Sequence, residues 1–354
     1  MLQHAIVVGA GIVGLLSAWE LLKNGWKVTL LEKQSPGDYR KGTSFAAAGM
    51  MVPYTELESA EDLIFTMGLK SLSLWPEILV RLPSKVYYTH RGGLILCHAR
   101  DRPHFDHVTQ RITRSVDPSC YAWIQAGALE PELEHFSRAL YLPHEANLDN
   151  QRLLPALIEY VQCHPHGDVF FGESVQELYP FRVMMKKGSM TADVVIDCRG
   201  MGAMNDFTDL RPVRGEAFLV RAPEVSLKRP VRLIHPRFSI YIAPREQGHY
   251  YIGATAIETR QSGPVKVRSA LELLSAAYSV HPSFGEAEIL ATYTGQRPAF
   301  PDHLPRLVVQ PGLLRINGLY RHGYLLGPVV AQILGAYLHH REIFLGRELL
   351  HQVA

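Results

Sequence analysis

Three glycines near the N-terminus, Gly9, Gly11 and Gly14, follow the spacing GxGxxG. The apolar residues 5–8 before them are typical of a buried strand, and residues 15–23 after them have the periodicity of a helix. Residues 27–31 indicate a second strand. In this context the glycines predict a turn that holds a pyrophosphate. The first permits a tight turn, the second lets the backbone approach the phosphates, and the third lets helix and strand pack closely.

Glu32, at the end of the second strand, adds to this prediction. Its carboxylate can accept both hydroxyls of an adenosine ribose and would repel a 2′-phosphate, while the helix start offers free N–H groups to the phosphates. FAD and NAD share this fingerprint. The small residues from Thr43 and Ser44 to Met50 have the composition of a segment that, in many flavoproteins, lies against the flavin ring. An ordinary alanine-rich helix start has the same composition.

The composition excludes several classes of protein. The chain has 354 residues, 47% apolar and 20% charged, which fits two globular domains or one large α/β body. Its 36 basic residues nearly cancel its 34 acidic ones, so we expect no nucleic acid partner. Four cysteines without a CxxC pair disfavour disulfides and metal sites. Since no uncharged apolar run is long enough for a membrane span and no basic residue precedes the apolar N-terminus, we expect a cytoplasmic protein.

The elements that position these residues alternate between helices and short strands. Helices are expected over residues 61–82, bent or broken at Pro76, from a cap at Asp149 to about 161, and over 267–278 and 328–338. Strands are expected over residues 94–98, 169–171, 181–185, 193–197, 214–220, 231–234, 239–243, 250–254 and 314–317. The chain therefore turns β-rich between residues 214 and 254.

With these segments identified, the sequence resembles the glycine oxidase branch of the D-amino acid oxidase family of FAD-dependent oxidoreductases, over nearly its whole length. Residues 213–216 (Val-Arg-Gly-Glu) resemble the start of the family's substrate sheet, and residues 241–245 (Tyr-Ile-Ala-Pro-Arg) its strand with a substrate-facing tyrosine. Residues 295–298 (Gly-Gln-Arg-Pro) resemble its carboxylate-binding arginine motif, and residues 318–323 its flavin-wrapping loop. Phe45, Ser239 and residues 198–202 depart from the family pattern.

The resemblance implies FAD, bound noncovalently because residues 290–294 lack the cysteine to which related sarcosine oxidases attach their flavin. The donors of residues 321–324 would face the flavin N1–C2=O region, where negative charge accumulates on reduction. The implied cofactor-binding residues are Gly9, Gly11, Ile12, Val13, Gly14, Glu32, Lys33, Thr43, Ser44, Ala48, Gly49, Met50, Val175, Leu319, Tyr320, Arg321, His322, Gly323, Tyr324 and Leu325.

The resemblance also implies a small amino acid substrate such as glycine or sarcosine. Arg297 would hold its carboxylate in a bidentate pair, with the Tyr241 hydroxyl as a second donor, and Arg321 and Met50 would line the pocket. No side chain is expected to act as an acid or base, because a hydride passes from Cα to flavin N5. The imine hydrolyses to a 2-oxo acid and ammonia, oxygen yields hydrogen peroxide, and the glycine imine serves thiamine thiazole synthesis.

The fold class implied is α/β (α+β), a Rossmann-like FAD-binding domain with a second, β-rich antiparallel-sheet substrate domain. The discontinuous FAD-binding domain would comprise residues 1–85, 145–205 and 295–354, and the substrate domain residues 86–144 and 206–294. Relatives often associate, so a homo-oligomer is left open. Three alternatives remain at this stage: a dehydrogenase with a different electron acceptor, a flavin-binding module without turnover, and a tRNA-modifying flavin domain, which the near-neutral charge disfavours.

Overall fold

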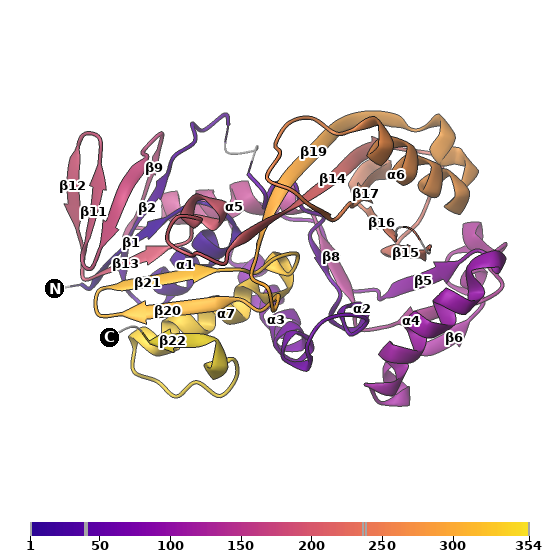
Figure 1. The fold of residues 1–354 in the computed structure, drawn as a ribbon, viewed down its shortest axis with the longest axis horizontal. Helices are drawn as coiled ribbons and strands as arrows, with labels where there is room; N and C mark the ends of the chain where they lie inside the picture. The colour runs from indigo at the N-terminus through magenta and orange to yellow at the C-terminus, as the bar shows by residue number, and fades with distance from the viewer. Residues whose placement is uncertain (1, 39–41, 236, 238, 353–354) are drawn as a thin grey trace.

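A computed structural model describes residues 2–38, 42–235, 237 and 239–352. Two large sheets lie at opposite ends of the molecule (Figure 1). The seven-stranded sheet beside both termini has the order β22-β20-β21-β13-β1-β2-β9. Its strands, in chain order, are β1 (His4–Val8), β2 (Lys27–Glu32), β9 (Gly167–Phe171), β13 (Val194–Asp197), β20 (Arg306–Gln310), β21 (Leu313–Asn317) and β22 (Leu350–Gln352). The five strands from β21 to β9 run parallel, as a Rossmann-like sheet requires.

Four helices lie on one face of this sheet: α1 (Ile12–Lys23), α3 (Asp62–Val80), α5 (Asn150–Cys163) and α7 (Gly323–Leu338). Helix α1 packs against both α5 and α7, and α3 packs against α7. Their apolar faces form one buried cluster with the sheet, which includes Leu15, Trp75 and Leu326. A three-stranded antiparallel sheet, β10 (Val175–Tyr179), β11 (Arg182–Met185) and β12 (Gly188–Thr191), packs against strands β1 and β2.

The second large sheet has nine strands, and eight of them follow the order β18-β14-β17-β16-β15-β5-β7-β6. They are β5 (Gly93–Cys97), β6 (Ala122–Ile124), β7 (Ala139–Leu142), β14 (Arg211–Arg221), β15 (Val231–Ile234), β16 (Ile240–Pro244), β17 (His249–Gly253) and β18 (Ile257–Glu258). The ninth, β19 (Glu288–Ala299), pairs along the whole of β14. Helices α4 (Arg102–Arg114) and α6 (Val267–Val280) lie at this end.

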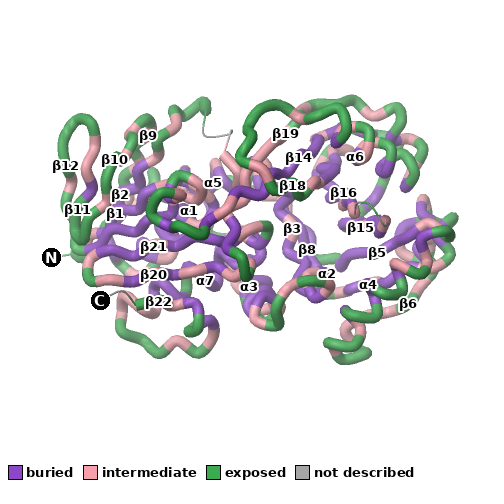
Figure 2. The backbone as a smooth tube through the Cα atoms, viewed as in Figure 1, coloured by how far each residue is buried: buried purple, intermediate pink, exposed green. Residues whose placement is uncertain are grey.

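A small sheet lies between the two halves (Figure 1). It joins β3 (Met50–Met51), β4 (Tyr88–Thr89) and β8 (Ala146–Leu148), and the short helix α2 (Pro53–Glu56) follows β3. Figure 2 shows that the central strands of both large sheets are buried, whereas the outer hairpins and helix faces are exposed. The small-residue stretch from Thr43 to Met50 therefore lies in the region where the halves meet.

Most predicted elements are confirmed with small shifts, but α7 begins five residues before the predicted start at Pro328. The prediction placed proline in the first turn, where its missing N–H costs nothing. In the structure Pro328 lies further inside, so it cannot donate to the carbonyl of Tyr324 four residues earlier. The indole N–H of Trp75 donates to that carbonyl at 3.1 Å instead. A tertiary contact thus replaces the missing helical bond.

Helix α3 runs without interruption through Pro76, where a bend or break was predicted. Among the described residues it is the one helix whose length and apolar character meet the requirement for crossing a membrane. One face of α3, which includes Met67, Leu72 and Trp75, is buried in the core cluster. The core helices of globular proteins commonly meet the same requirement.

Candidate active site

The glycine-rich turn joins β1 to α1 in a conformation that needs its glycines. Gly9 has a φ of +104°, and a Cβ there would lie 2.7 Å from the carbonyl oxygen of Cys198. A Cβ on Gly14 would lie 1.9 Å from the Gly9 carbonyl oxygen. A Cβ on Gly11, the N-cap residue of α1, would meet only the Ser44 hydroxyl, at 3.3 Å. Gly9 and Gly14 therefore shape the turn itself, while the surface above Gly11 is open to a ligand.

Glu32 lies beside this turn at the end of β2. Its two carboxylate oxygens accept the backbone N–H groups of Ala10 at 2.8 Å and Gln34 at 3.0 Å, which orient the side chain. Lys33 follows as an exposed residue. Val175, at the start of β10, packs with Val8 and Leu31 near the same ends of β1 and β2. The predicted adenosine side is thus assembled from three separate segments.

The small-residue stretch passes the start of α1. The Ser44 hydroxyl accepts the backbone N–H of Ile12 at 3.0 Å, and the Thr43 hydroxyl donates to the Gln296 carbonyl at 3.0 Å. Ala48 and Gly49 are buried, and a Cβ on Gly49 would lie 2.4 Å from the Leu148 carbonyl oxygen. The stretch therefore connects the helix N-terminus to β19, which carries Arg297.

The loop at residues 318–325 closes the same region. Gly323 lies against Ile12, and the Tyr324 hydroxyl donates to the Ser44 carbonyl at 2.7 Å. The backbone N–H of Tyr320 donates to the Pro298 carbonyl at 2.9 Å. The side chains of Leu319 and Leu325 are buried in the core cluster, so only their backbone groups can serve a cofactor. Four segments that are distant in sequence meet around the start of α1.

These residues fit a bound dinucleotide. The first turn of α1 offers backbone N–H groups that have no partner within the helix. The buried His322 Nδ1, in the loop next to this turn, has no hydrogen-bond partner in the described part of the chain. A buried polar atom without a partner is costly, and a ligand with polar groups would supply one.

Two of the four predicted substrate residues, Tyr241 on β16 and Arg297 on β19, lie on the second large sheet. Arg297 on β19 donates from Nη1 to the Thr255 carbonyl at 2.9 Å, and its guanidinium packs against Gly215 on β14. Burial raises the pKa of the Tyr241 hydroxyl, and the nearby charges of Arg297 and Arg321 oppose this shift. Met50 packs with Tyr241 and Tyr251 in one cluster. The structure thus brings all four predicted substrate residues to one place.

Arg321 and Arg297 differ in their partners. Arg321 donates from Nε to Glu56 at 2.8 Å and from Nη2 to the Ser59 hydroxyl at 2.8 Å. In the described residues, no carboxylate lies within ion-pair distance of Arg297. Arg297 is therefore the arginine that can take up the carboxylate of a ligand.

Comparison with known proteins identifies the family. The sequence matches the family described as FAD dependent oxidoreductase, abbreviated DAO, over residues 4–337. The chain belongs to this DAO family of FAD-dependent oxidoreductases. The cofactor is FAD, and the mixed α/β fold predicted from sequence is confirmed.

The relatives of this oxidoreductase extend over its length. It is 39% identical over 333 residues to a protein of Rhizobium etli named as a thiamine biosynthesis oxidoreductase, ThiO, which covers 93% of this chain and 94% of the relative. It is 26% identical to glycine oxidase of Geobacillus kaustophilus over 95% of this chain and 93% of that protein. The crystal structure of glycine oxidase from that organism has the same fold, with a TM-score of 0.85, 24% identity and coverage of 97% and 96%.

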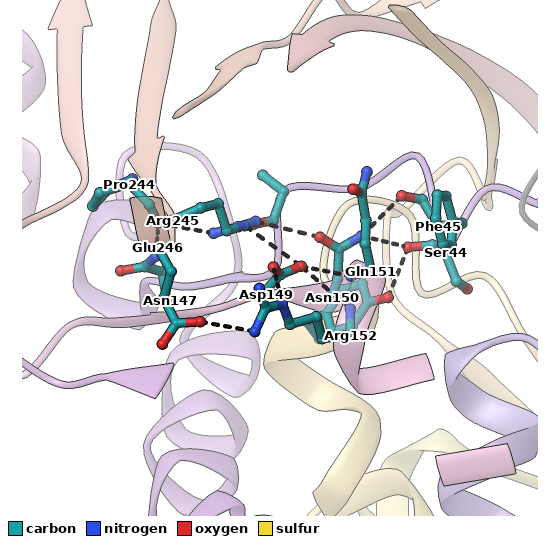
Figure 3. Close-up of polar contacts among 12 residues, drawn as sticks. Ser44, Phe45, Asn147, Asp149, Asn150, Gln151, Arg152, Pro244, Arg245 and Glu246 are labelled. Atoms are coloured by element: carbon teal, nitrogen blue, oxygen red, sulfur yellow. Dashed lines mark hydrogen bonds and ion pairs between the residues drawn. The ribbon is translucent and has the colours of Figure 1, made fainter. Parts of the chain in front are cut away.

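Sequence reasoning missed the polar network that holds the small-residue stretch from Thr43 to Met50 (Figure 3). The Asn150 amide donates to the carbonyls of Ser44 at 3.1 Å and Phe45 at 2.9 Å, and the buried guanidinium of Arg245 donates to the Ala48 carbonyl. Asp149 lies 3.8 Å from Arg245 and caps α5, as predicted. Asn150 and Arg245 are 95 residues apart, so no local pattern could have joined them.

The glycine in the motif at residues 213–216 is required because the Arg297 guanidinium packs against Gly215. Its neighbours Arg214 and Glu216 are buried and paired with each other at 2.6 Å, away from Arg297. A Cβ at Gly215 would lie 2.3 Å from Arg297 Nη2. We expect Gly215→Ala to fold and keep FAD, because the flexible Arg297 side chain can move away from the new methyl group. The displaced guanidinium should lower kcat/KM for the amino acid substrate about tenfold or more. Steady-state kinetics with the flavin content measured in parallel test this, and unchanged kinetics would contradict the contact.

Glu145 gives the oxidoreductase a pH-dependent stability. The side chain is buried, its Oε1 accepts the Thr55 backbone N–H at 2.8 Å, and burial raises its pKa from the usual 4.5 to about 7. The folded state thus holds a proton that the unfolded state loses, so stability falls as pH rises from about 4.5 through 7. We expect the melting temperature of Glu145→Gln, taken relative to that of wild type at the same pH, to rise as pH increases from 5 to 8. Exposed Glu134→Gln serves as the control, and parallel curves for both variants would refute the assignment.

Proposed function

We propose that this oxidoreductase oxidises a small amino acid, with glycine as the first choice and sarcosine or small D-amino acids as further substrates. The observation that carries the proposal is the half-buried Arg297, which has no carboxylate partner in the described chain and lies beside the Tyr241 hydroxyl. A planar guanidinium binds a carboxylate through two parallel bonds and so fixes both its charge and its orientation.

In this proposal Arg297 and Tyr241 hold the substrate carboxylate, and Met50 and Arg321 bound the pocket. No side chain acts as an acid or base, because the substrate amine reacts in its neutral form. Bound FAD would supply the acceptor for the hydride lost from the substrate Cα, and oxygen would take up these electrons to give hydrogen peroxide. The resulting imine adds water and breaks down to a 2-oxo acid and ammonia. The protein's contribution is orientation and charge.

The proposal assigns FAD, noncovalently bound, to residues 9–14, Glu32 and Lys33, residues 43–50, Val175 and residues 319–325. It keeps the predicted division into an FAD-binding domain (residues 1–85, 145–205 and 295–354) and a substrate domain (residues 86–144 and 206–294). The seven-stranded and nine-stranded sheets support this division, although β19 extends across the predicted boundary at residues 294 and 295.

A role in thiamine biosynthesis follows from the relatives. The Rhizobium etli relative is named for that pathway, and a relative of Trichormus variabilis is a bifunctional ThiO/ThiG protein, 28% identical over 96% of this chain and 53% of that protein. We infer that the imine made from glycine serves the thiazole ring of thiamine.

An anaerobic titration with glycine tests the proposed function. We expect glycine to bleach the visible flavin band and readmitted air to restore it, with release of hydrogen peroxide. Bleaching without recovery in air would replace oxygen by another acceptor and make the protein a dehydrogenase. A flavin band that neither glycine, sarcosine nor D-alanine bleaches would overturn the substrate assignment.

A further inference from the structure

Three arginines lie near Tyr241. Arg297 and Arg321 are close enough for their charges to act on it, and Arg232 lies directly opposite Tyr241 in the pairing of β15 with β16. Side chains of directly opposed residues project from the same face of a sheet. A site with three free guanidinium groups would attract polyanionic ligands strongly.

Two carboxylates from one short segment neutralise two of these arginines. Glu56, the last residue of α2, accepts from Arg321 at 2.8 Å, and Glu58 accepts from Arg232. Glu56 also accepts from His322 Nε2 at 2.9 Å. In the described residues the Arg297 guanidinium has the Thr255 carbonyl and the Tyr241 hydroxyl as neighbours, but no carboxylate within ion-pair distance. One unpaired cation therefore remains for the substrate.

Glu56 is largely buried and surrounded by positively charged side chains. Its side chain is only 13% exposed, and burial acts to raise its pKa, but the charges of Arg321, His322 and Arg232 lower the pKa below its ordinary value. The carboxylate therefore stays ionised at neutral pH. The backbone N–H of Thr55, the residue before it, donates to the buried Glu145 at 2.8 Å, which fixes the end of α2 against β8 and β5.

We propose that Glu56 sets the charge class of the substrate. By neutralising Arg321 it leaves Arg297 as the cation available to a ligand, so the site accepts amines with one carboxylate and discriminates against amines with a second acidic group. Without Glu56, Arg321 would pair with a second ligand carboxylate, held in place through its bond to Ser59. This inference rests on the proposed amino acid substrate and specifies its class.

The test compares two carboxylate ligands that cannot be oxidised, acetate and malonate, through the perturbation of the flavin absorbance at constant ionic strength. For wild type we expect malonate to bind no more tightly than acetate, despite its larger charge. For Glu56→Gln we expect the affinity for malonate to rise relative to acetate by about tenfold to a hundredfold, as a new charge-assisted pair provides. Turnover of iminodiacetate, which is glycine with a second carboxymethyl group, should rise relative to glycine in the same variant.

A double variant shows whether Arg321 is responsible. Glu56→Gln combined with Arg321→Gln should lose the gain for malonate, whereas exposed Glu77→Gln, which pairs with Lys23 and Arg81, should match wild type. A gain that survives in the double variant, or equal changes for both ligands, would overturn the proposal. If Glu56→Gln does not fold, tenfold tighter binding of malonate than acetate by wild type still refutes it. Because the acetate and malonate readouts measure binding and not turnover, they can fail independently of the glycine titration that tests the proposed function.

Discussion

Arg297→Ala should lower kcat/KM for glycine on the order of a hundredfold or more while the FAD content stays close to wild type. In the proposed binding mode the variant loses two charge-assisted hydrogen bonds to the substrate carboxylate, each worth roughly 1.5–3 kcal/mol. It also loses the alignment that a bidentate pair imposes, so kcat is expected to fall together with a rise in KM. The FAD should remain because Arg297 lies on β19 in the second sheet, whereas the glycine-rich turn begins α1.

Two further variants make this result specific. Arg297→Lys keeps the positive charge but not the planar fork, so its kcat/KM should lie between wild type and Arg297→Ala. Arg221→Ala removes an exposed arginine of β14 that pairs with Glu288, and it should behave as wild type. The measurement is steady-state oxygen consumption, normalised to bound flavin. Wild-type turnover by Arg297→Ala would remove this residue from the active site.

Gly11→Val should give a folded protein that retains little FAD. Gly11 has φ −72° and ψ 174°, a conformation open to any residue, and a Cβ there meets only the Ser44 hydroxyl at 3.3 Å. The branched side chain would instead fill the space in which the pyrophosphate approaches the backbone. The flavin-to-protein absorbance ratio of the purified variant measures the loss, and far-ultraviolet circular dichroism checks the fold.

Gly14→Ala provides the contrast. Its Cβ would collide with the Gly9 carbonyl oxygen at 1.9 Å, so this variant should lose stability as well as cofactor. Gly11→Val should therefore affect cofactor binding alone, whereas Gly14→Ala should affect folding as well. Full FAD occupancy in Gly11→Val would show that the phosphates lie elsewhere.

The N-terminal half of the site could be predicted because its signals are local. The glycine spacing, the flanking strand and helix and the acidic end of β2 fall within the first 32 residues, and each reflects a backbone requirement. The predicted cap at Asp149 was found for the same reason, since its carboxylate accepts from Gln151 and Arg152. Residues that act on their own neighbours leave a pattern in the sequence.

The remaining parts depend on contacts between distant segments. Glu56 and Arg321, which form an ion pair, are 265 residues apart in the sequence. Asn150 can bind the Ser44 carbonyl only because the start of α5 lies beside residues 44 and 45. Arg297 was found by resemblance alone. Gly and Pro flank it, as in a loop, yet it lies within the 12-residue strand β19. The surrounding sheet, through the pairing of β19 with β14, overrode the local preference for a turn.

The stretch around residues 43–48 belongs to neither half of the molecule. Ile12 and Tyr324 hold it from the nucleotide side, and Arg245 and Tyr251 hold it from the other sheet. In the proposed site, neither half alone contains all the residues that bind the flavin, so binding requires that the two halves be docked. Bound FAD should therefore stabilise the docking of the two halves, and its loss should weaken that docking.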